Sequence, residues 1–236
     1  MVAAGNVPSP WAEAAKGCFR LAGIPIAINR LARGDTAQKE WTQSHNAPVV
    51  FHDDEPPRTV WSQILALAAR LGPAGALLPV ELGRRAAMVG MIHELAGEDG
   101  MGWNARLTMI HASFESAGAR GFSLPIASYL AAKYGYAPHR IEAARAQVIA
   151  TLTALGAHLE RRDYFSGDRP MALDVYAATF LTPLSDVSEE DCPAFAAPIR
   201  AAFRVAHDEL EAHVPESLRA HRRRMFERHL GWPIVL

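Results

Sequence analysis

The sequence predicts a chain of two parts, an α/β segment in the N-terminal third and an all-helical remainder. Two short β-rich runs, at 24–28 and 48–51, alternate with helical patterns in the first part. The Gly-Pro-Ala-Gly run at 72–75 then breaks the pattern, and no strand-like alternation follows it. We therefore expect an N-terminal α/β domain over residues 1–75 and a helical domain over residues 80–236.

The elements of the first part have local signals. Ser9 and Pro10 are typical of a helix start, with Ser at the cap and Pro in the first turn, and Gly23 ends that helix. The apolar residues between Trp61 and Leu71 recur at helical spacing. The expected elements are a helix at 11–22, a strand at 24–28, a helix at 36–43, a strand at 48–51, a turn at 52–57 and a helix at 61–71.

The second part is predicted to contain helices only. Its first helical stretch holds four glycines, Gly90, Gly97, Gly100 and Gly102. Each glycine inside a helix costs about 1 kcal/mol relative to alanine, so a close neighbouring helix or a ligand should compensate. The expected helices are at about 80–117, 123–135, 138–161, 171–184, 191–212 and 216–229.

The charge balance excludes some partners. The chain has 24 basic and 25 acidic side chains, a formal net charge of −1, which offers no bulk attraction to nucleic acid or acidic membranes. No uninterrupted apolar run approaches the ~18 residues that a membrane span needs. The densest basic run, at 221–224, is expected to be a solvated helix face. We therefore expect neither a nucleic-acid nor a membrane partner.

Metal and disulfide signals are weak. Cys18 and Cys192 have no paired spacing, which indicates neither a disulfide framework nor a zinc site. His93-Glu94 begins like the zinc-protease motif HExxH, but Gly97 stands where the second histidine would be. The N-terminus lacks the pattern of a signal peptide. These features predict a cytoplasmic protein without a bound metal.

Two separated segments carry a family resemblance. The first is NAPVVF at 46–51, followed by a helix that starts TVWSQI at 59–64, and the second is YFSGDRPMALDVY at 164–176. Together they resemble the two signature regions of the glutathione S-transferase superfamily. The resemblance implies an α/β thioredoxin-like N-terminal domain that binds glutathione and an all-α C-terminal helical bundle that binds a second substrate.

The first segment implies the main glutathione contacts. A proline that enters a strand cannot donate to the ladder, and the bond before it is a candidate for the cis form. By resemblance, the Ala47–Pro48 bond is cis, and the main chain of Ala47 pairs with the cysteinyl part of glutathione like an added strand. An ordinary trans bond at a strand start is the alternative from the residues alone.

The pair Trp61-Ser62 is the second implied contact. A helix N-terminus presents free N–H groups and a partial positive charge, and Ser62 adds a hydroxyl donor for the γ-glutamyl carboxylate. Trp61 stands where the family usually has an acidic residue for the γ-glutamyl ammonium. Acidic residues at 53–55 could replace it, and Arg58 could pair with a ligand carboxylate; a plain helix cap is the alternative for Ser62.

Ser9 is the implied catalytic residue. Family members place a Ser, Tyr or Cys after the first strand, where its hydroxyl or thiol contacts the glutathione sulfur. A hydroxyl that donates to a thiolate beside a helix N-terminus lowers the thiol pKa, and the thiolate is the nucleophile. Residues 1–7 are a poor strand, so the usual first strand is expected to be short or degenerate. A cap without chemistry is the alternative for Ser9.

The remaining implied residues belong to the second-substrate pocket. The long glycine-containing helix of the family borders that pocket and the dimer interface, which places His93, Trp103, Arg106 and Met109 near it, with Trp11 from the first helix. Packing between helices is the alternative for these residues. In the second segment Asp174 is retained from a helix-capping box whose Ser or Thr is replaced by Met171, a structural motif to which we assign no chemistry.

The expected activity is attack of the glutathione thiolate on a hydrophobic electrophile, with glutathione as co-substrate, in a homodimer. A non-catalytic binding or scaffold protein on the same fold is the first alternative. A glutathione-dependent lyase, isomerase or dehalogenase is the second.

Overall fold

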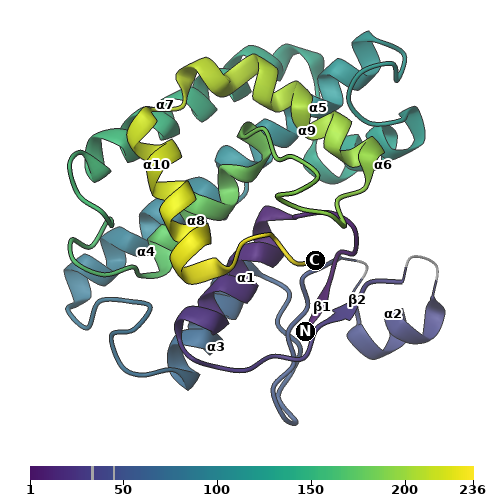
Figure 1. The fold of residues 1–236 in the computed structure, drawn as a ribbon. Coiled ribbons are helices and arrows are strands. Elements are labelled where there is room, and N and C mark those ends of the chain that lie inside the picture. Colours follow the sequence, from purple (N-terminus) through teal and green to yellow (C-terminus); the bar gives the residue numbers. More distant parts are fainter. Residues whose placement is uncertain (33–34, 45) are drawn as a thin grey trace.

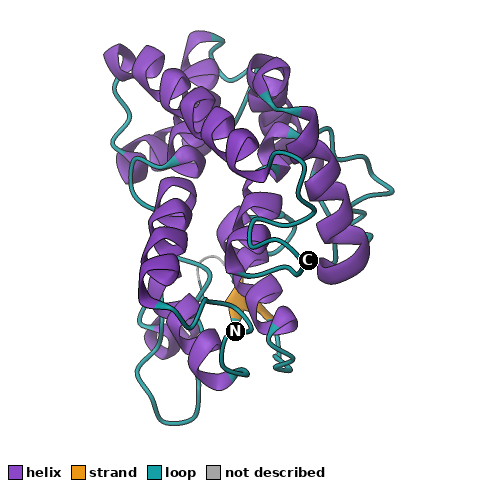
Figure 2. Cartoon of the chain, turned by 90° about the vertical axis from the view of Figure 1, so that its left-hand side faces the viewer, coloured by secondary structure: helices purple, strands orange, loops and turns teal. Residues whose placement is uncertain are grey.

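The computed structural model of the protein describes residues 1–32, 35–44 and 46–236. A small α/β part formed by the N-terminal residues lies against a larger bundle of helices (Figure 1). Helices dominate the molecule, and the strands form a small patch beside the N-terminus (Figure 2). Across the described residues, every helix is too short or too polar to span a bilayer.

The helices of the N-terminal part are α1 (Pro10–Leu21), α2 (Thr36–Thr42) and α3 (Trp61–Leu71). The bundle contains α4 (Leu82–Ala96), α5 (Met101–Glu115), α6 (Leu124–Tyr134), α7 (Ile141–Leu159), α8 (Ala172–Phe180), α9 (Ala197–Leu210) and α10 (Glu216–Met225). Short 3-10 turns lie at Pro138–Arg140, Thr182–Leu184 and Glu211–His213, and a π-helical turn at Phe226–Leu230 follows α10.

The sheet is minimal. Strand β1 (Val2–Ala3) pairs in parallel with β2 (Asn29–Arg30). On its other side, Val2 forms an antiparallel bridge with Val49, and Val50 forms one with Arg58. The expectation of a short first strand at 1–7 is therefore confirmed, whereas the strand predicted at 48–51 is reduced to two isolated bridges, at Val49 and Val50.

The predicted strand at 24–28 is wrong in position, because the strand begins at Asn29. Pro25 has no N–H to give to a ladder. The segment instead runs toward β1, where the Met1 ammonium donates to the Ala27 carbonyl at 2.7 Å and the Asn29 N–H donates to Met1 at 2.9 Å. Alternating apolar residues mark a partly buried segment here, without regular pairing.

The predicted helix at 80–117 is two helices, α4 and α5. Gly97 ends α4, with its N–H on the His93 carbonyl, and Gly100 is the N-cap of α5. A Cβ on Gly102 would lie 2.5 Å from a ring atom of Phe180, so this glycine permits close contact of α5 with α8. The glycine signal therefore marked two helix ends and one close approach.

The two predicted helices at 171–184 and 191–212 also have different ends. Helix α8 ends at Phe180, and a separate 3-10 turn follows it. Helix α9 begins at Ala197 because the preceding loop is closed by Ser188 and Asp191, each of which accepts a backbone N–H from the other at 2.9–3.1 Å. Such side-chain to backbone bonds compete with helix formation.

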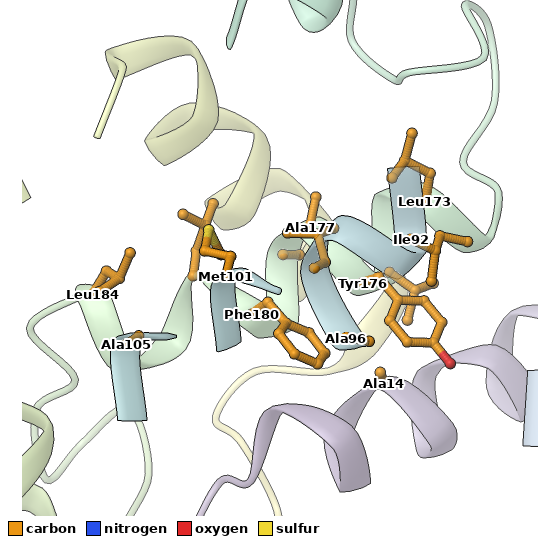
Figure 3. Close-up of a cluster of buried hydrophobic side chains, with 14 of the residues drawn as sticks. Ala14, Ile92, Ala96, Met101, Ala105, Leu173, Tyr176, Ala177, Phe180 and Leu184 are labelled. Atoms are coloured by element: carbon orange, nitrogen blue, oxygen red, sulfur yellow. The ribbon is translucent and has the colours of Figure 1, made fainter. Parts of the chain in front are cut away.

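Helix α1 packs against the helical bundle through α8. Ala14 of α1 faces the rings of Tyr176 and Phe180, with Ile92 and Ala96 of α4 beside them (Figure 3). All five residues are buried. The first helix therefore belongs to the hydrophobic core of the helical part as well as to its own.

A buried polar cluster ties α8 to α10. The Asp174 carboxylate is fully buried and accepts the backbone N–H of Met171 at 2.8 Å and that of Phe165 at 2.9 Å. The Nε2 of His221 lies 2.9 Å from the same carboxylate, and His221 is also fully buried. The half of the capping box expected to be retained is present, since Asp174 accepts the backbone N–H of the cap residue Met171.

The basic run at 221–224 is not a solvated face throughout, which corrects that prediction. His221 and Arg222 point inward, and only Arg223 is exposed. Burial lowers the pKa of Arg222 to about 10, and its guanidinium lies 4.8 Å from the centre of the Phe226 ring. Arg224 pairs with Asp163 at 3.0 Å. The helix is amphipathic, so the first two members of the run face the core and Arg223 faces solvent.

Candidate functional site

The three predicted glutathione-binding segments lie at one end of the small sheet. Val49 pairs antiparallel with Val2, so the residues before Val49 lie opposite those that follow Val2 toward Ser9. Val50 pairs antiparallel with Arg58, so the residues after Arg58 also run back beside Pro48. The register therefore brings the Ala47–Pro48 segment between the chain leading to Ser9 and the start of α3.

Ser9 is the N-cap residue of α1, and its side chain makes no capping hydrogen bond. It is half-buried, and Pro10 occupies the first helical position. The helix N-terminus carries a partial positive charge and free N–H groups. The Ser9 hydroxyl is thus not used by the helix and lies where an anion is stabilised.

The Ala47–Pro48 bond is cis, as expected. Pro48 is buried and Ala47 half-buried. The side chain of Asn46 accepts a hydrogen bond from Lys133 of α6 at 2.7 Å, which ties this loop to the helical part. Beside it, Trp41 and Phe51 stack with ring centres 4.6 Å apart. Neither contact had a sequence signal, because both join residues of different elements.

Ser62 is exposed in the first turn of α3, whose N-cap, Val60, provides no side-chain acceptor. Among the described residues, no side chain caps the first N–H groups of α3. Trp61 is half-buried at the contact between the two parts, with its ring centre 6.1 Å from that of His93 and 5.9 Å from that of Tyr176. Trp61 is thus used in packing.

The acidic residues that could replace an acid at position 61 differ in availability. Glu55 pairs with Arg70 at 2.6 Å and with Arg58, and it also contacts His52 at 3.1 Å. The Arg70 hydrogen bond is the main reason that the pKa of Glu55 falls to about 2. Arg58 is committed to Glu55 and to the Pro56 carbonyl. Of the three acidic residues in the turn at 52–57, Asp53 and Asp54 are exposed and Glu55 is half-buried.

The five residues predicted for the second-substrate pocket make the following contacts. Trp11 donates its indole N–H to the Ala96 carbonyl at 2.9 Å and contacts the Phe180 ring edge-on at 4.9 Å. His93 is exposed at the α4 end. Trp103 donates to the Tyr134 carbonyl at 3.0 Å.

Arg106 and Met109 lie inside the helical bundle. The Arg106 guanidinium lies between the rings of Phe122 and Phe203, at 5.5 and 5.3 Å, and donates to the Met109 sulfur at 3.7 Å. Burial lowers the pKa of Arg106. Met109 is 1% exposed. Both residues pack between helices in this structure, and their role in a pocket stays a prediction.

Both cysteines are buried and unpaired. Burial raises the pKa of Cys18 to about 12 and that of Cys192 to about 11. The thiolate is the reactive form of cysteine, so neither residue is suited to be a nucleophile in the folded protein. In the described part of the chain, no group of three or more His, Cys, Asp or Glu side chains comes together to hold a metal.

We expect Cys18 and Cys192 to resist alkylation in the native protein because their thiolates are scarce and shielded. Iodoacetamide at mildly alkaline pH should leave both unmodified, and both should react in denaturant. Mass spectrometry after timed quenching measures the two rates. Rapid labelling of either cysteine without denaturant would contradict its burial.

Comparisons with solved structures define the fold class. A glutathione S-transferase from Methylobacterium radiotolerans JCM 2831, in complex with glutathione sulfonate, aligns over 100% of this chain and 95% of its own, with 20% identity and a TM-score of 0.61. A glutathione S-transferase domain-containing protein from Marinobacter aquaeolei VT8 aligns over 97% and 98%, with 15% identity and a TM-score of 0.64. A maleylacetoacetate isomerase from Methylobacterium extorquens AM1, with malonate and glutathione bound, aligns over 95% and 97%, with 19% identity and a TM-score of 0.52.

The chain therefore has the glutathione S-transferase fold, a thioredoxin-like N-terminal part followed by a helical part. Residues 138–224 match the family described as "Glutathione S-transferase, C-terminal domain". The resemblance of this chain to the glutathione S-transferase superfamily is confirmed by both findings. No curated protein matches the sequence significantly.

Proposed function

We propose that this protein binds glutathione and conjugates its thiolate, through a new sulfur–carbon bond, to an electrophilic, hydrophobic small molecule. The observation that supports this most is the meeting of three segments, at Ser9, Ala47–Pro48 and Ser62, at one end of the sheet. The solved structures with glutathione or its sulfonate bound share the fold. The proposal divides the chain at the loop after α3, with domains over 1–75 and 80–236.

The residues of this chain fit the γ-glutamyl carboxylate and the cysteinyl part of glutathione better than they fit the γ-glutamyl ammonium. The start of α3 offers uncapped N–H groups and the Ser62 hydroxyl, which suit the γ-glutamyl carboxylate. The main chain of Ala47 would pair with the cysteinyl part. Position 61 supplies no acid for the ammonium, and Asp53 or Asp54 would have to contact it.

In this proposal Ser9 donates its hydroxyl hydrogen to the glutathione sulfur. The donation and the α1 N-terminus stabilise the thiolate, which lowers the thiol pKa and raises the fraction of nucleophile at neutral pH. The sulfur then forms a bond to the electrophilic carbon, and the leaving group departs or the double bond takes up a proton. Because both cysteines are buried, the chain itself supplies no competing thiol.

Two alternatives rest on particular observations. Trp61 in place of an acid, and its use in packing, favour a binding or scaffold protein that has lost catalysis. The isomerase with the same fold favours a glutathione-dependent isomerase. We further propose a cytoplasmic homodimer, in keeping with two unpaired cysteines and the family resemblance.

Calorimetric titration with reduced glutathione tests the proposal. We expect binding in the micromolar to millimolar range. The Ser62→Ala variant should bind about 10-fold more weakly, because it loses a hydrogen bond to a charged carboxylate.

A matched control is available for this titration. Ser123 is also an exposed serine at a helix start without a side-chain capping bond, and Ser123→Ala should bind like the wild type. Absence of heat at several millimolar glutathione would contradict the proposal and favour the scaffold protein.

A further inference from the structure

Arg222 of α10 is a buried cation that forms no ion pair with the described residues. Its side chain is 8% exposed. Burial lowers the pKa of Arg222 to about 10, so the guanidinium remains protonated at neutral pH. The acidic group that acts on it is Asp191, whose carboxylate accepts the backbone N–H of Ser188 at 2.9 Å. A buried charge without a paired partner is costly, which makes this arginine unusual.

The unsatisfied donors of Arg222 lie on one edge of its guanidinium. Its Nε and Nη2 atoms are fully buried and have no hydrogen-bond partner among the described residues. In the planar guanidinium these two nitrogens are neighbours, and their N–H groups point in the same direction. Roughly 90% or more of buried polar groups in proteins are hydrogen-bonded. The edge matches the two oxygens of a carboxylate or phosphate, which accept two parallel hydrogen bonds.

Two aromatic rings hold the guanidinium without using these donors. The ring centre of Phe226 lies 4.8 Å from the guanidinium carbon and that of Trp232 lies 5.8 Å from it. The ring faces attract the positive charge, but they do not supply the in-plane acceptors that the two N–H groups need. A water molecule accepts hydrogen bonds but carries no charge. An oxyanion is therefore the acceptor that satisfies both the donors and the charge.

The surroundings of Arg222 are formed by well-defined main chain. Phe226 begins the π-helical turn after α10, and turns of this rare type occur frequently at functional sites. The C-terminal segment that follows is tied to the loop before α9, where the Ile234 N–H donates to the Asp191 carbonyl at 2.7 Å. Trp232 in this segment is 40% exposed. This side of the arginine thus lies close to solvent, from which a small anion can approach.

We propose that Arg222 is the anchor of a binding site for a small oxyanion, a carboxylate or phosphate group. Two oxygens of the anion accept the Nε–H and Nη2–H groups side by side, and the rings of Phe226 and Trp232 flank the guanidinium. Because the negative charge of Asp191 opposes the anion, we expect a Kd in the millimolar range. The inference does not rest on the proposed function, since its test needs no glutathione.

Nuclear magnetic resonance titration with inorganic phosphate and, separately, with acetate tests the inference, with sodium chloride as the control salt at equal ionic strength. The titration follows the side-chain Nε–H signal of Arg222, assigned through its contacts with the rings of Phe226 and Trp232. We expect this signal to shift and saturate with phosphate, acetate or both, and not with chloride. A response to phosphate alone would assign the site to a phosphate group, and a response to acetate alone to a carboxylate.

A pair of variants tests the role of the guanidinium edge. R222K keeps the positive charge but lacks the two-nitrogen edge, and it should bind the anion at least about 10-fold more weakly. R223K makes the same change at an exposed position of the same helix and should bind like the wild type. Their affinities are measured by calorimetry, and circular dichroism confirms that each variant is folded.

Three results would overturn the inference. The first is an Arg222 signal that neither anion shifts in the millimolar range. The second is an equal shift with chloride, and the third is an affinity that R222K leaves unchanged or that both variants weaken equally. The wild-type signal decides the matter alone if R222K does not fold.

Discussion

Replacing Asp174 with alanine is expected to lower the free energy of unfolding by about 3–5 kcal/mol, because several buried hydrogen-bonding groups lose their acceptor, each at a cost of about 1–3 kcal/mol. The carboxylate satisfies two backbone N–H groups, those of Phe165 and Met171, and contacts the imidazole of His221. Its loss leaves all three groups buried without this acceptor. Since α8 contacts α1, α4 and α10, its frayed start would weaken the whole bundle.

Urea unfolding followed by circular dichroism measures this loss. Asp168 provides a matched control, because it is an exposed aspartate in the loop before α8 with no ion pair among the described residues. Asp168→Ala should change the free energy of unfolding by less than about 0.5 kcal/mol. A loss below about 1 kcal/mol for Asp174→Ala would show that water or a rearranged side chain replaces the carboxylate.

Replacing Ser9 with alanine is expected to lower kcat/KM for glutathione conjugation by about 100-fold, if the proposed transferase activity is present. The hydroxyl makes no capping bond to α1, so its removal should leave the helix and the free energy of unfolding nearly unchanged. The loss should come from a higher pKa of bound glutathione. One pKa unit corresponds to a tenfold change in the fraction of thiolate at neutral pH.

The pH dependence of the reaction distinguishes this role from a structural one. In the Ser9→Ala variant, the reaction rate should begin to rise at a higher pH than in the wild type. The pKa of the bound thiol is higher in the variant, so the thiolate forms only at a higher pH. A Ser9→Cys variant, which retains a weak donor, should recover part of the rate. An unchanged profile would assign Ser9 to the cap position alone, even if glutathione still binds.

The two-part division and the helix cores could be predicted because their signals are local. Helices α1 and α3 follow from apolar spacing and from the cap residues at their ends. The break between α4 and α5 also had a local signal, the glycines at 97 and 100. Glycines inside an apolar pattern can equally indicate close packing of another helix, so the signal was ambiguous. The contact of Gly102 with Phe180 shows that both meanings occur within one stretch.

The geometry of the candidate site could be predicted less well, because it comes from contacts between residues that are distant in the sequence. Family resemblance pointed to Ser9, Pro48 and Ser62, whose positions at one sheet end depend on bridges that no short motif encodes. The use of Trp61 in packing depends on Tyr176, far along the chain. The inward orientation of His221 was hidden because a run of basic residues resembles a solvent face.

The anchoring of Trp11 has a mechanical consequence. Two residues after Ser9, this side chain is held by the Ala96 carbonyl and the Phe180 ring, both in the helical part. The paired strands of the sheet are only two residues long, so the sheet restrains the chain before Ser9 less than these two contacts do. The position of the Ser9 hydroxyl is therefore set by α4 and α8. A displacement of either helix would move Trp11 and, with it, the hydroxyl of Ser9.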